Sequence, residues 1–411
     1  MKILIKGIGL VIRKKLVSNI LILGGDGYLG WPSAMNFSSQ GHKVTVVDNY
    51  FRRNISKKIN VPPLYKIPSL VERANIWHKK TGNEIKVVIC DLANPENMRK
   101  LFSGDFDYKW AINKTFNGMP DSVIHFAEQP SAPFSQRSYK DADFTLVNNL
   151  RVTNNLIWTV RDYSPDTHII KLGTMGEYGT PNIDIEEGWI DINHKGRVDK
   201  FLFPRQASSI YHTTKIMDTD LLWFAVRTWG LRVTDLMQGP VYGIETEESK
   251  IDKKLRTLFN YDEIFGTVIN RFIVQAVIGH PLTIYGSGSQ IRGYLNIIDT
   301  LSCLNVAEKN PPKNGKLSIY NQIVELFSVE ELAKMIQKVG NSRGYKVRIK
   351  KIENPRVEKE NHYYNPKYQG LKEIGLKPNY LNEAFLNNFF KIIEENQNLI
   401  KRDIIFNGVN W

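Results

Sequence analysis

The chain contains 411 residues, of which 42% are hydrophobic, and its formal net charge is +13 at pH 7. A chain of this length buries a sizeable core and fits two domains or one large domain with a smaller lobe. Its two cysteines, Cys90 and Cys303, lie far apart in apolar runs and support neither a disulfide framework nor a metal site. The basic residues are scattered, which disfavours nucleic acid as a partner and suits a small polyanion such as a dinucleotide, a nucleotide sugar or an inorganic oxyanion.

The first residues, MKILIKGIGLVIRKKLVSN, contain a short apolar run that lysines and an arginine interrupt, and no cleavage site for a signal peptide follows. No other segment approaches the roughly 18 consecutive apolar residues that a membrane-spanning helix needs. We therefore expect a soluble, cytoplasmic protein without a membrane partner, in which residues 1–18 form an N-terminal extension.

From residue 19 onward, short β-branched runs alternate with longer helical patterns. This alternation is typical of an α/β fold with a Rossmann-type, doubly wound parallel sheet. A segment at 49–84 contains three prolines and predicts a loop, followed by a helix that begins at Ser69, with Glu72 completing a capping box. The predicted strands are 19–24, 43–48, 85–90, 122–127, 168–173 and 231–236.

After residue 243 the pattern changes to mixed helices and strands, including a second capping box at Ser328 and Glu331. We therefore predict a Rossmann domain at 19–243 and a smaller C-terminal α/β lobe at 244–411, with some crossing of the chain between them. The first would bind the cofactor and the second the substrate.

A glycine-rich turn follows the first predicted strand, with Gly24, Gly27 and Gly30 spaced G-x-x-G-x-x-G before a helical pattern. A tight turn, close approach to a pyrophosphate and close packing of helix on strand each favour glycine. Asp48 ends the next strand, where its carboxylate can accept hydrogen bonds from an adenosine ribose. This acidic group favours NAD over NADP as the cofactor, although Arg52 and Arg53 lie nearby. The alternative is a glycine-rich turn without a ligand.

Asp91 and Leu92 follow the third strand, where this architecture commonly meets the adenine, although Asp91 could equally cap the next helix. Asn148 is a further candidate, while the adjacent Asn149 could be an ordinary helix residue. The residues predicted to bind the cofactor are Gly24, Asp26, Gly27, Tyr28, Gly30, Asp48, Asn49, Arg52, Arg53, Asp91, Leu92, Asn148, Tyr211, Lys215 and Val241.

Tyr211 and Lys215 lie four residues apart in a helical pattern and therefore point from one face of the helix. A lysine cation stabilises a tyrosinate, and lowering a tyrosine pKa from about 10 to near 7 takes roughly 4 kcal/mol. Thr174 adds a hydroxyl at the carboxyl end of a strand, where open α/β sheets bind ligands. We predict that these three residues form a catalytic triad; the alternative is a surface tyrosine with a solvated lysine.

With these residues assembled, the chain resembles the extended short-chain dehydrogenase/reductase superfamily, and within it the sugar-nucleotide-modifying family of UDP-sulfoquinovose synthases. The resemblance extends from about residue 20 to 411. The sequence departs from the expected family motif at Pro130, where the motif is expected to have an arginine that contacts an anion. The similarity rests on the strings GGDGYLGW, VDNYFRR, HFAEQ with SAPFS, KLGTMGEYGTPNIDIEEG, PRQASSIYH, DLMQGPVYG, GTVINRF, IRGYLNIIDT and NPRVEKENHYYN.

The resemblance implies that UDP-glucose and sulfite become UDP-sulfoquinovose with tightly held NAD. Oxidation at C4 would acidify the C5 proton, water would leave across C5 and C6, sulfite would attack C6, and the ketone would be reduced again. Related 4,6-dehydratases place an Asp-Glu pair after the threonine, where this chain has Met175 and Gly176. Glu177 and His212 would then manage the C5 proton and the departing water, unless they are a backbone cap and a structural hydrogen-bonding group.

The predicted catalytic residues are thus Thr174, Tyr211, Lys215, Glu177, His212 and Met175. The residues predicted to bind the substrate are Gln129, Thr174, Gln238, Asn270, Arg271, Arg292 and Arg356. The resemblance assigns the last two to the pyrophosphate, for which a guanidinium fork is well suited; the alternative for each is a surface ion pair.

Two other functions fit the same residues. An NAD-dependent UDP-sugar 4-epimerase needs the triad but no elimination machinery, and a non-catalytic NAD-binding regulator needs only the cofactor site. We also expect a homo-oligomer, because relatives often pair through two long helices, here the segments 141–162 and 205–229.

Overall fold

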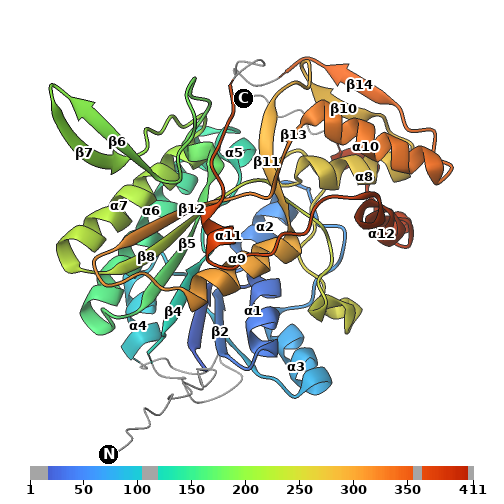
Figure 1. Cartoon of the computed structure of the whole chain (residues 1–411). Coiled ribbons are helices and arrows are strands. Elements are labelled where there is room, and N and C mark those ends of the chain that lie inside the picture. Colours follow the sequence, from blue (N-terminus) through green and yellow to red (C-terminus); the bar gives the residue numbers. More distant parts are fainter. Residues whose placement is uncertain (1–16, 104–118, 355–362, 406–411) are drawn as a thin grey trace, which may run out of the picture.

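The computed structural model describes residues 17–103, 119–354 and 363–405, and a seven-stranded parallel sheet lies at its centre (Figure 1). All six strands expected from the sequence are present in it, which confirms the Rossmann-type fold class. The seventh, β12, was not predicted and adds to the edge beside β8. In spatial order the strands are β12 (Leu317–Gln322), β8 (Arg232–Gln238), β5 (His168–Thr174), β4 (Ser122–His125), β1 (Asn19–Leu23), β2 (Lys43–Asp48) and β3 (Ile85–Ile89).

Helices cover both faces of this sheet because successive side chains of a strand point to opposite sides. In β1, Ile20 and Ile22 belong to one apolar cluster, whereas Leu21 and Leu23 belong to another. The helices on the first face are α1 (Gly30–Ser39), α3 (Leu70–Thr81), α9 (Ile297–Lys309) and α11 (Gly370–Glu373), and those on the second are α4 (Pro95–Ser103), α6 (Tyr139–Tyr163) and α7 (Ile210–Trp229).

A second lobe has its own apolar core around the helices α8 (Val268–Val277), α10 (Val329–Ser342) and α12 (Glu383–Glu394). Two small sheets accompany these helices. The chain crosses between the lobes: 61–67 supplies side chains to this core, while β12, α9 and α11 return to the central sheet. The small sheets contain β10 (Leu282–Tyr285) with β14 (Ile349–Ile352), and β13 (Glu325–Ser328) with β11 (Ile291–Asn296) and β9 (Val241–Tyr242).

The expectation of a loop at the start of the segment 49–84 is wrong, because helix α2 (Phe51–Lys58) forms there. This helix is short and mostly polar, and its few apolar residues, Phe51 and Ile55 with Ile59 just beyond it, pack against the core of the second lobe. Tertiary contacts hold it: the Arg52 guanidinium lies 3.2 Å from the centre of the Phe265 ring. The expected helix α3 does begin after Ser69, whose hydroxyl accepts a hydrogen bond from the Glu72 backbone N–H, and the Ser328 capping box is complete.

Several short elements complete the described structure. A hairpin of β6 (Trp189–His194) and β7 (Arg197–Leu202) projects away from the body of the molecule (Figure 1). No helix in the described ranges is long and apolar enough to cross a membrane. The remaining elements are α5 (Ala132–Ser135) and the 3-10 turns η2 (Met175–Glu177), η3 (Glu248–Lys250), η4 (Lys253–Leu255), η5 (Gln397–Leu399) and η6 (Arg402–Ile404).

Candidate active site

A cavity of about 1040 Å³ lies at the carboxyl ends of the central strands and is lined by residues from both lobes. Most predicted site residues meet there, although they come from distant parts of the sequence. Four predicted residues, Asp26, Arg53, Gln129 and Glu177, do not line it, and Arg356 lies outside the described residues. Those that line it are Gly24, Gly27, Tyr28, Gly30, Asp48, Asn49, Arg52, Asp91, Leu92, Asn148, Thr174, Met175, Tyr211, His212, Lys215, Gln238, Val241, Asn270, Arg271 and Arg292.

The glycine turn after β1 forms one end of the cavity, and each glycine has a different steric role. Gly24 has φ of 89°, and a Cβ there would lie 2.7 Å from the Phe126 carbonyl carbon. At Gly30 a Cβ would lie 2.0 Å from the Gly24 oxygen, so helix and turn could not pack as they do. At Gly27 the nearest protein atom would be 3.5 Å away, so a side chain here would fill cavity space instead. This cradle fits a dinucleotide pyrophosphate.

Asp48 is the last residue of β2, and its carboxylate lies beside this turn. Its two oxygens accept hydrogen bonds from the backbone N–H groups of Asp26, at 2.9 Å, and Tyr50, at 2.6 Å. Burial raises the pKa of Asp48 to about 6, and the neighbouring Asp26 contributes further to the increase. A fixed carboxylate at this position can accept hydrogen bonds from an adenosine ribose, as the sequence predicts.

Asp26 and Arg53 are corrected from cofactor contacts to a support behind Asp48, in which Asp26 is buried and Arg53 partly exposed. Arg53 donates two hydrogen bonds to Asp26, at 3.0 and 2.7 Å, and Arg73 donates a third from a fully buried position. The predictions failed because the polar partners of Asp26 come from α2 and α3, which the glycine motif does not contain. Arg52 does reach the cavity, where it donates to Asn260 and stacks on Phe265.

At the expected adenine position, Asp91 does not cap α4, because the Glu96 N–H in the first turn of that helix donates to Asn94 instead; the contact with adenine stays a prediction. The Asp91 carboxylate lines the cavity, accepts a hydrogen bond from Asn49, and also accepts one from the Ala93 backbone N–H in the turn before α4. Asn148 faces the cavity and donates to the Asn149 side chain. Asn149 is fully buried, so the two adjacent asparagines have separate positions.

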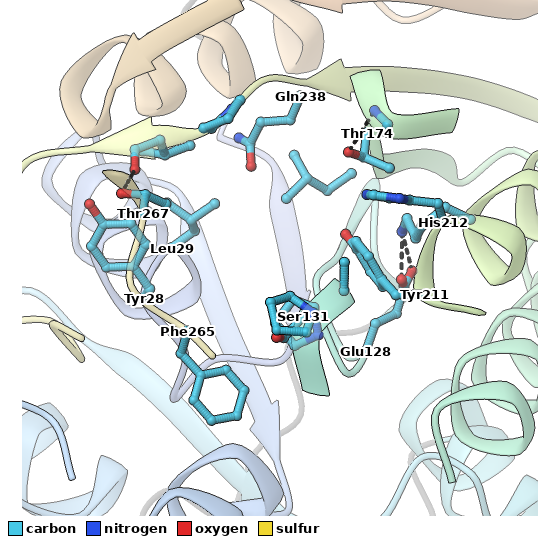
Figure 2. A pocket seen from close by; sticks show the side chains of 18 of the residues that line it. Tyr28, Leu29, Glu128, Ser131, Thr174, Tyr211, His212, Gln238, Phe265 and Thr267 are labelled. Carbon is cyan, nitrogen blue, oxygen red and sulfur yellow. Dashed lines mark hydrogen bonds and ion pairs between the residues drawn. The ribbon is translucent and has the colours of Figure 1, made fainter. Parts of the chain in front are cut away.

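The triad residues meet at the other end of the cavity, where Figure 2 shows Thr174, Tyr211 and His212 pointing inward. Ser209 begins α7 by accepting a hydrogen bond from the His212 backbone N–H, which fixes the first turn that carries Tyr211. Burial raises the pKa of Tyr211 above its ordinary value of 10.0, and Glu128 is the next cause of that increase. The hydroxyl of Thr174 accepts the Gly176 N–H, so its own hydrogen remains available to a ligand.

His212 explains why this chain has a glycine after Met175. A Cβ at Gly176 would lie only 2.3 Å from Nε2 of His212, so the ring occupies the space that a larger side chain would need. The other ring nitrogen, Nδ1, lies 3.2 Å from the Ser208 hydroxyl. Met175 is buried beside this ring and lines the cavity. A side chain at position 176 would therefore require the His212 ring to move from this place.

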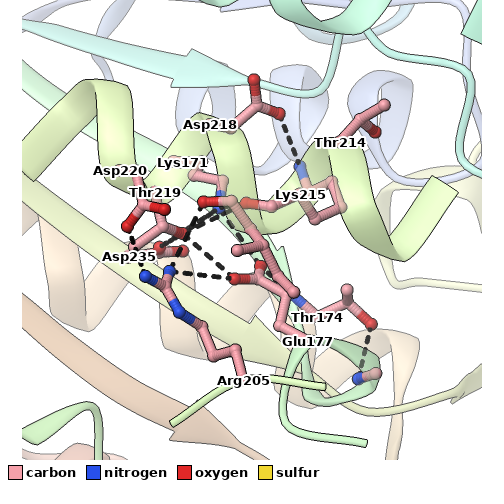
Figure 3. Close-up of polar contacts among 12 residues, drawn as sticks. Lys171, Thr174, Glu177, Arg205, Thr214, Lys215, Asp218, Thr219, Asp220 and Asp235 are labelled. Atoms are coloured by element: carbon pink, nitrogen blue, oxygen red, sulfur yellow. Dashed lines mark hydrogen bonds and ion pairs between the residues drawn. The ribbon is translucent and has the colours of Figure 1, made fainter. Parts of the chain in front are cut away.

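Glu177 is corrected from a residue that contacts the substrate to one that supports Thr174 from behind. It caps the backbone N–H of Thr174, and its carboxylate lies 3.2 Å from the Lys171 ammonium (Figure 3). Thr219 and Asp235 complete this buried cluster, with Arg205 at 3.8 Å. Burial raises the pKa of Glu177 to about 7, and Lys171 partly offsets the increase. Of the two roles open to Glu177, the backbone cap is present.

Gln129 is corrected in the same way. Its side chain is buried, donates to the Ser131 carbonyl and the Thr145 hydroxyl, and thus shapes the turn after β4 instead of contacting the cavity. Pro130, the departure from the expected motif, is exposed and lines the cavity. The basic side chain expected at 130 is therefore replaced by a rigid turn residue at the cavity wall.

The second lobe supplies the polar wall opposite the triad. Arg271 lies 3.6 Å from the Glu263 carboxylate, and its guanidinium stands over the Tyr285 ring. Arg292 stands over Tyr364. Both arginines line the cavity with forked donors; of the two, Arg292 is the one that the resemblance assigns to the pyrophosphate, and Arg271 was predicted only as a substrate-binding residue. Asn270 uses its side-chain oxygen to accept the Gly243 N–H, while Gln238 donates to Gln322.

Comparisons with known proteins agree with this geometry. A family model described as "NAD dependent epimerase/dehydratase family" matches residues 20–321. UDP-sulfoquinovose synthase, chloroplastic, of Spinacia oleracea is 42% identical over 392 residues, covering 95% of this chain and 79% of that protein. UDP-sulfoquinovose synthase of Sulfolobus acidocaldarius is 41% identical, with 87% and 88% covered. The chain belongs to the NAD dependent epimerase/dehydratase family, and within it to the UDP-sulfoquinovose synthase family.

The cofactor of this family is NAD, in agreement with the Asp48 prediction. Among solved structures, UDP-glucose 4-epimerase from Bifidobacterium longum in complex with NAD+ and UDP superimposes with a TM-score of 0.67. It is 17% identical, covers 93% of this chain and all of its own, and so supports the fold alone. The spinach relative is named chloroplastic, so the cytoplasmic location of this chain stays a prediction.

Sequence reasoning missed several residues of this UDP-sulfoquinovose synthase family site. Glu128 lies within the HFAEQ string and forms an ion pair with Lys215, but nothing in its spacing indicates the partner. Lys171 sits inside an apolar strand, and a charged residue in such a run is itself a signal of a buried ion pair. Glu263 and Tyr285 in the second lobe had no motif that could have found them.

Proposed function

We propose that the protein converts UDP-glucose and sulfite to UDP-sulfoquinovose with NAD as a tightly held cofactor. The observation that carries the proposal is the replacement of the Asp-Glu pair by Met175 and Gly176 beside an intact Thr174, Tyr211 and Lys215. This arrangement keeps the groups for oxidation at C4 while giving His212 the space of the missing pair. Gly24, Gly27, Gly30 and Asp48 would hold NAD, whose nicotinamide would supply the acceptor and later the donor of a hydride exchanged with C4 of the sugar.

The chain's own residues would manage the protons of this oxidation. Tyr211 takes the proton of the C4 hydroxyl, and the Thr174 hydroxyl donates a hydrogen bond to the same oxygen. Burial holds the Tyr211 phenol protonated, so it needs nearby positive charge to act as a base at neutral pH. Lys215 on the next turn of α7 and the oxidised nicotinamide provide that charge.

The resulting 4-ketone acidifies the C5 proton, so that water can leave across C5 and C6. His212 is the titratable group in the cavity wall beside Met175, and we assign it the protons of this elimination. Sulfite then forms a carbon–sulfur bond at C6, C5 regains a proton, and the ketone is reduced. Glu177 acts from behind by holding the Thr174 backbone.

The second lobe would hold the nucleotide. Arg271 and Arg292 offer forked guanidinium groups to the diphosphate, and Asn270 lines the passage between the lobes. Arg356 stays a prediction, since it lies outside the described residues.

A homo-oligomer is also proposed. The packed helices α6 and α7 expose the apolar side chains Val147, Trp158, Met217 and Phe224. Light scattering of the purified protein tests this part: a monomeric mass would contradict it.

The function is tested by incubating the purified protein with UDP-glucose, NAD and sulfite, separating the nucleotide sugars by chromatography and identifying each by mass spectrometry against standards. A sulfonated nucleotide sugar supports the proposal. UDP-galactose without a sulfonated product would instead identify a 4-epimerase. Bound NAD without turnover of any nucleotide sugar, unchanged in the Tyr211→Phe variant, would identify a regulator.

A further inference from the structure

The catalytic lysine is already held by a carboxylate that the proposed mechanism does not use. Both oxygens of Glu128 accept hydrogen bonds from the Lys215 ammonium, at 2.6 and 2.5 Å. The two side chains are only 4% and 2% exposed, so solvent screens this ion pair little. Glu128 follows β4, whereas Lys215 belongs to α7, and both line the cavity. The pair therefore joins two distant elements directly at the reaction site.

A buried ammonium needs such a partner because removing charge from water is costly. Other charges also face Lys215. Asp218 on α7 lies 3.9 Å away, Glu177 acts from the neighbouring turn, and the Lys171 ammonium on β5 donates to the Lys215 carbonyl at 3.1 Å. His125 on β4 approaches the far side of Glu128 at 3.5 Å. Among all these groups, Glu128 alone is in direct contact with both the ammonium and the cavity surface in the described part of the chain.

The position of this carboxylate has a consequence for Tyr211. The phenol lies one helical turn before Lys215 and depends on a nearby cation to lose its proton. A carboxylate clamped on that cation cancels much of its field at the phenol. Glu128 is also the largest of the charges that oppose ionisation of Tyr211, after burial itself.

We infer that Glu128 is a positioning residue of the oxidation step: its carboxylate fixes the Lys215 ammonium in place and offsets the positive charge that Lys215 would otherwise present to the Tyr211 phenol. The inference rests on the proposed function in one respect, namely that Tyr211 is the base of the C4 oxidation. Glu128 thus keeps the phenol protonated when no further positive charge is near, which ties the activation of Tyr211 to the presence of the oxidised cofactor.

The test is the Glu128→Gln substitution in the full-length protein with NAD bound, since it keeps the shape but removes the charge. Phenolate formation at Tyr211 is followed by ultraviolet difference spectroscopy against the same protein carrying Tyr211→Phe. We expect Tyr211 to ionise about one pH unit lower than in the parent protein. The acidic limb of the rate of sugar oxidation should move to lower pH by the same amount. A Tyr211 titration that is unchanged, or that moves to higher pH, would overturn the inference.

Two further variants keep the result interpretable. Glu187→Gln removes a half-buried carboxylate that does not line the cavity, and Tyr211 should then titrate as in the parent. Glu128→Asp keeps the charge, so Tyr211 should titrate close to the parent value; a shift of about one pH unit or more in this variant would overturn the inference whether or not Glu128→Gln folds. The phenolate titration needs no substrate, so its result holds even if UDP-glucose is not sulfonated. A failure of the proposed function can therefore be told apart from a failure of this inference.

Discussion

The two ends of the cavity are built by different means. At the adenosine end, a turn of three glycines and one carboxylate leave space for the cofactor, and the key contacts are made with backbone atoms, within the turn itself and at Phe126. At the catalytic end, buried charges from β4, β5, α7 and β8 hold one another in place around Tyr211. Shape therefore determines binding at the first end, whereas long-range ion pairs determine reactivity at the second.

The largest effect is expected when the base at the catalytic end is removed. Tyr211→Phe should lower the rate of sugar oxidation about 1000-fold, because no other group takes the C4 proton. NAD should remain bound, since the adenosine end is untouched. Reduced nicotinamide absorbance and the cofactor content of the purified variant measure the two effects. Simultaneous loss of NAD would show that the two ends are not separable.

The buried cluster itself can be tested through Lys171. Lys171→Met leaves Glu177 and Asp235 without their central cation, and we expect the free energy of unfolding to fall by about 3 kcal/mol. Denaturant titration measures this loss. The matched control is Lys338→Met, which breaks an exposed ion pair with Glu383 and should leave stability unchanged. Equal losses in both variants would contradict the central role given to the buried cluster.

Substitutions at two glycines test the different steric roles assigned to them at the adenosine end. Gly30→Ala should lower the free energy of unfolding by about 2 kcal/mol even without NAD, because its Cβ would collide with the Gly24 carbonyl. Gly27→Ala should leave the stability of the NAD-free protein intact but weaken NAD binding, since its Cβ fills only cavity space. Thermal unfolding and calorimetric binding separate these outcomes. Similar destabilisation by both substitutions would refute the assignment of distinct roles.

The smallest effect concerns pH. The folded pKa of Asp48 is raised to about 6 from 3.8, so its ionised form costs stability above about pH 6, and this cost disappears as the pH falls. Protonation also removes the acceptor for the ribose, so NAD affinity should fall roughly fivefold between pH 7 and pH 5. Asp48→Asn should bind NAD more weakly and without this pH dependence. An affinity in the parent protein that does not change with pH would contradict the assignment.

The contrast between the ends also explains what could be predicted from the sequence. Gly24, Gly27, Gly30 and Asp48 were found because their spacing within one short segment is itself the signal, although Gly24 also packs against the Phe126 backbone after β4. The spacing of Tyr211 and Lys215 likewise indicates that both side chains lie on one face of a single helix. Whether these residues line one cavity could be judged only from the fold. The alternation of strands and helices predicted six strands of its central sheet, but not β12, α2 or the hairpin of β6 and β7.

The failures have a common cause. Glu177, Gln129, Asp26 and Arg53 were placed in the site because they adjoin site residues in the sequence. Their side chains turn away because buried partners from other elements hold them, as Lys171 does Glu177 and Arg73 does Asp26. A periodic pattern shows which face of an element is buried, but it does not identify the partner of a buried charge.

The central claim is that Tyr211 and NAD transiently make a ketone at C4 so that sulfite can replace the C6 hydroxyl. It is tested most directly with UDP-glucose carrying deuterium at C4, in a single turnover with sulfite and excess enzyme, sampled by mass spectrometry over time. We predict that the deuterium appears transiently on the nicotinamide ring and then returns to C4 of a sulfonated product. Deuterium that stays on the sugar throughout turnover, with none on the nicotinamide, would contradict the account.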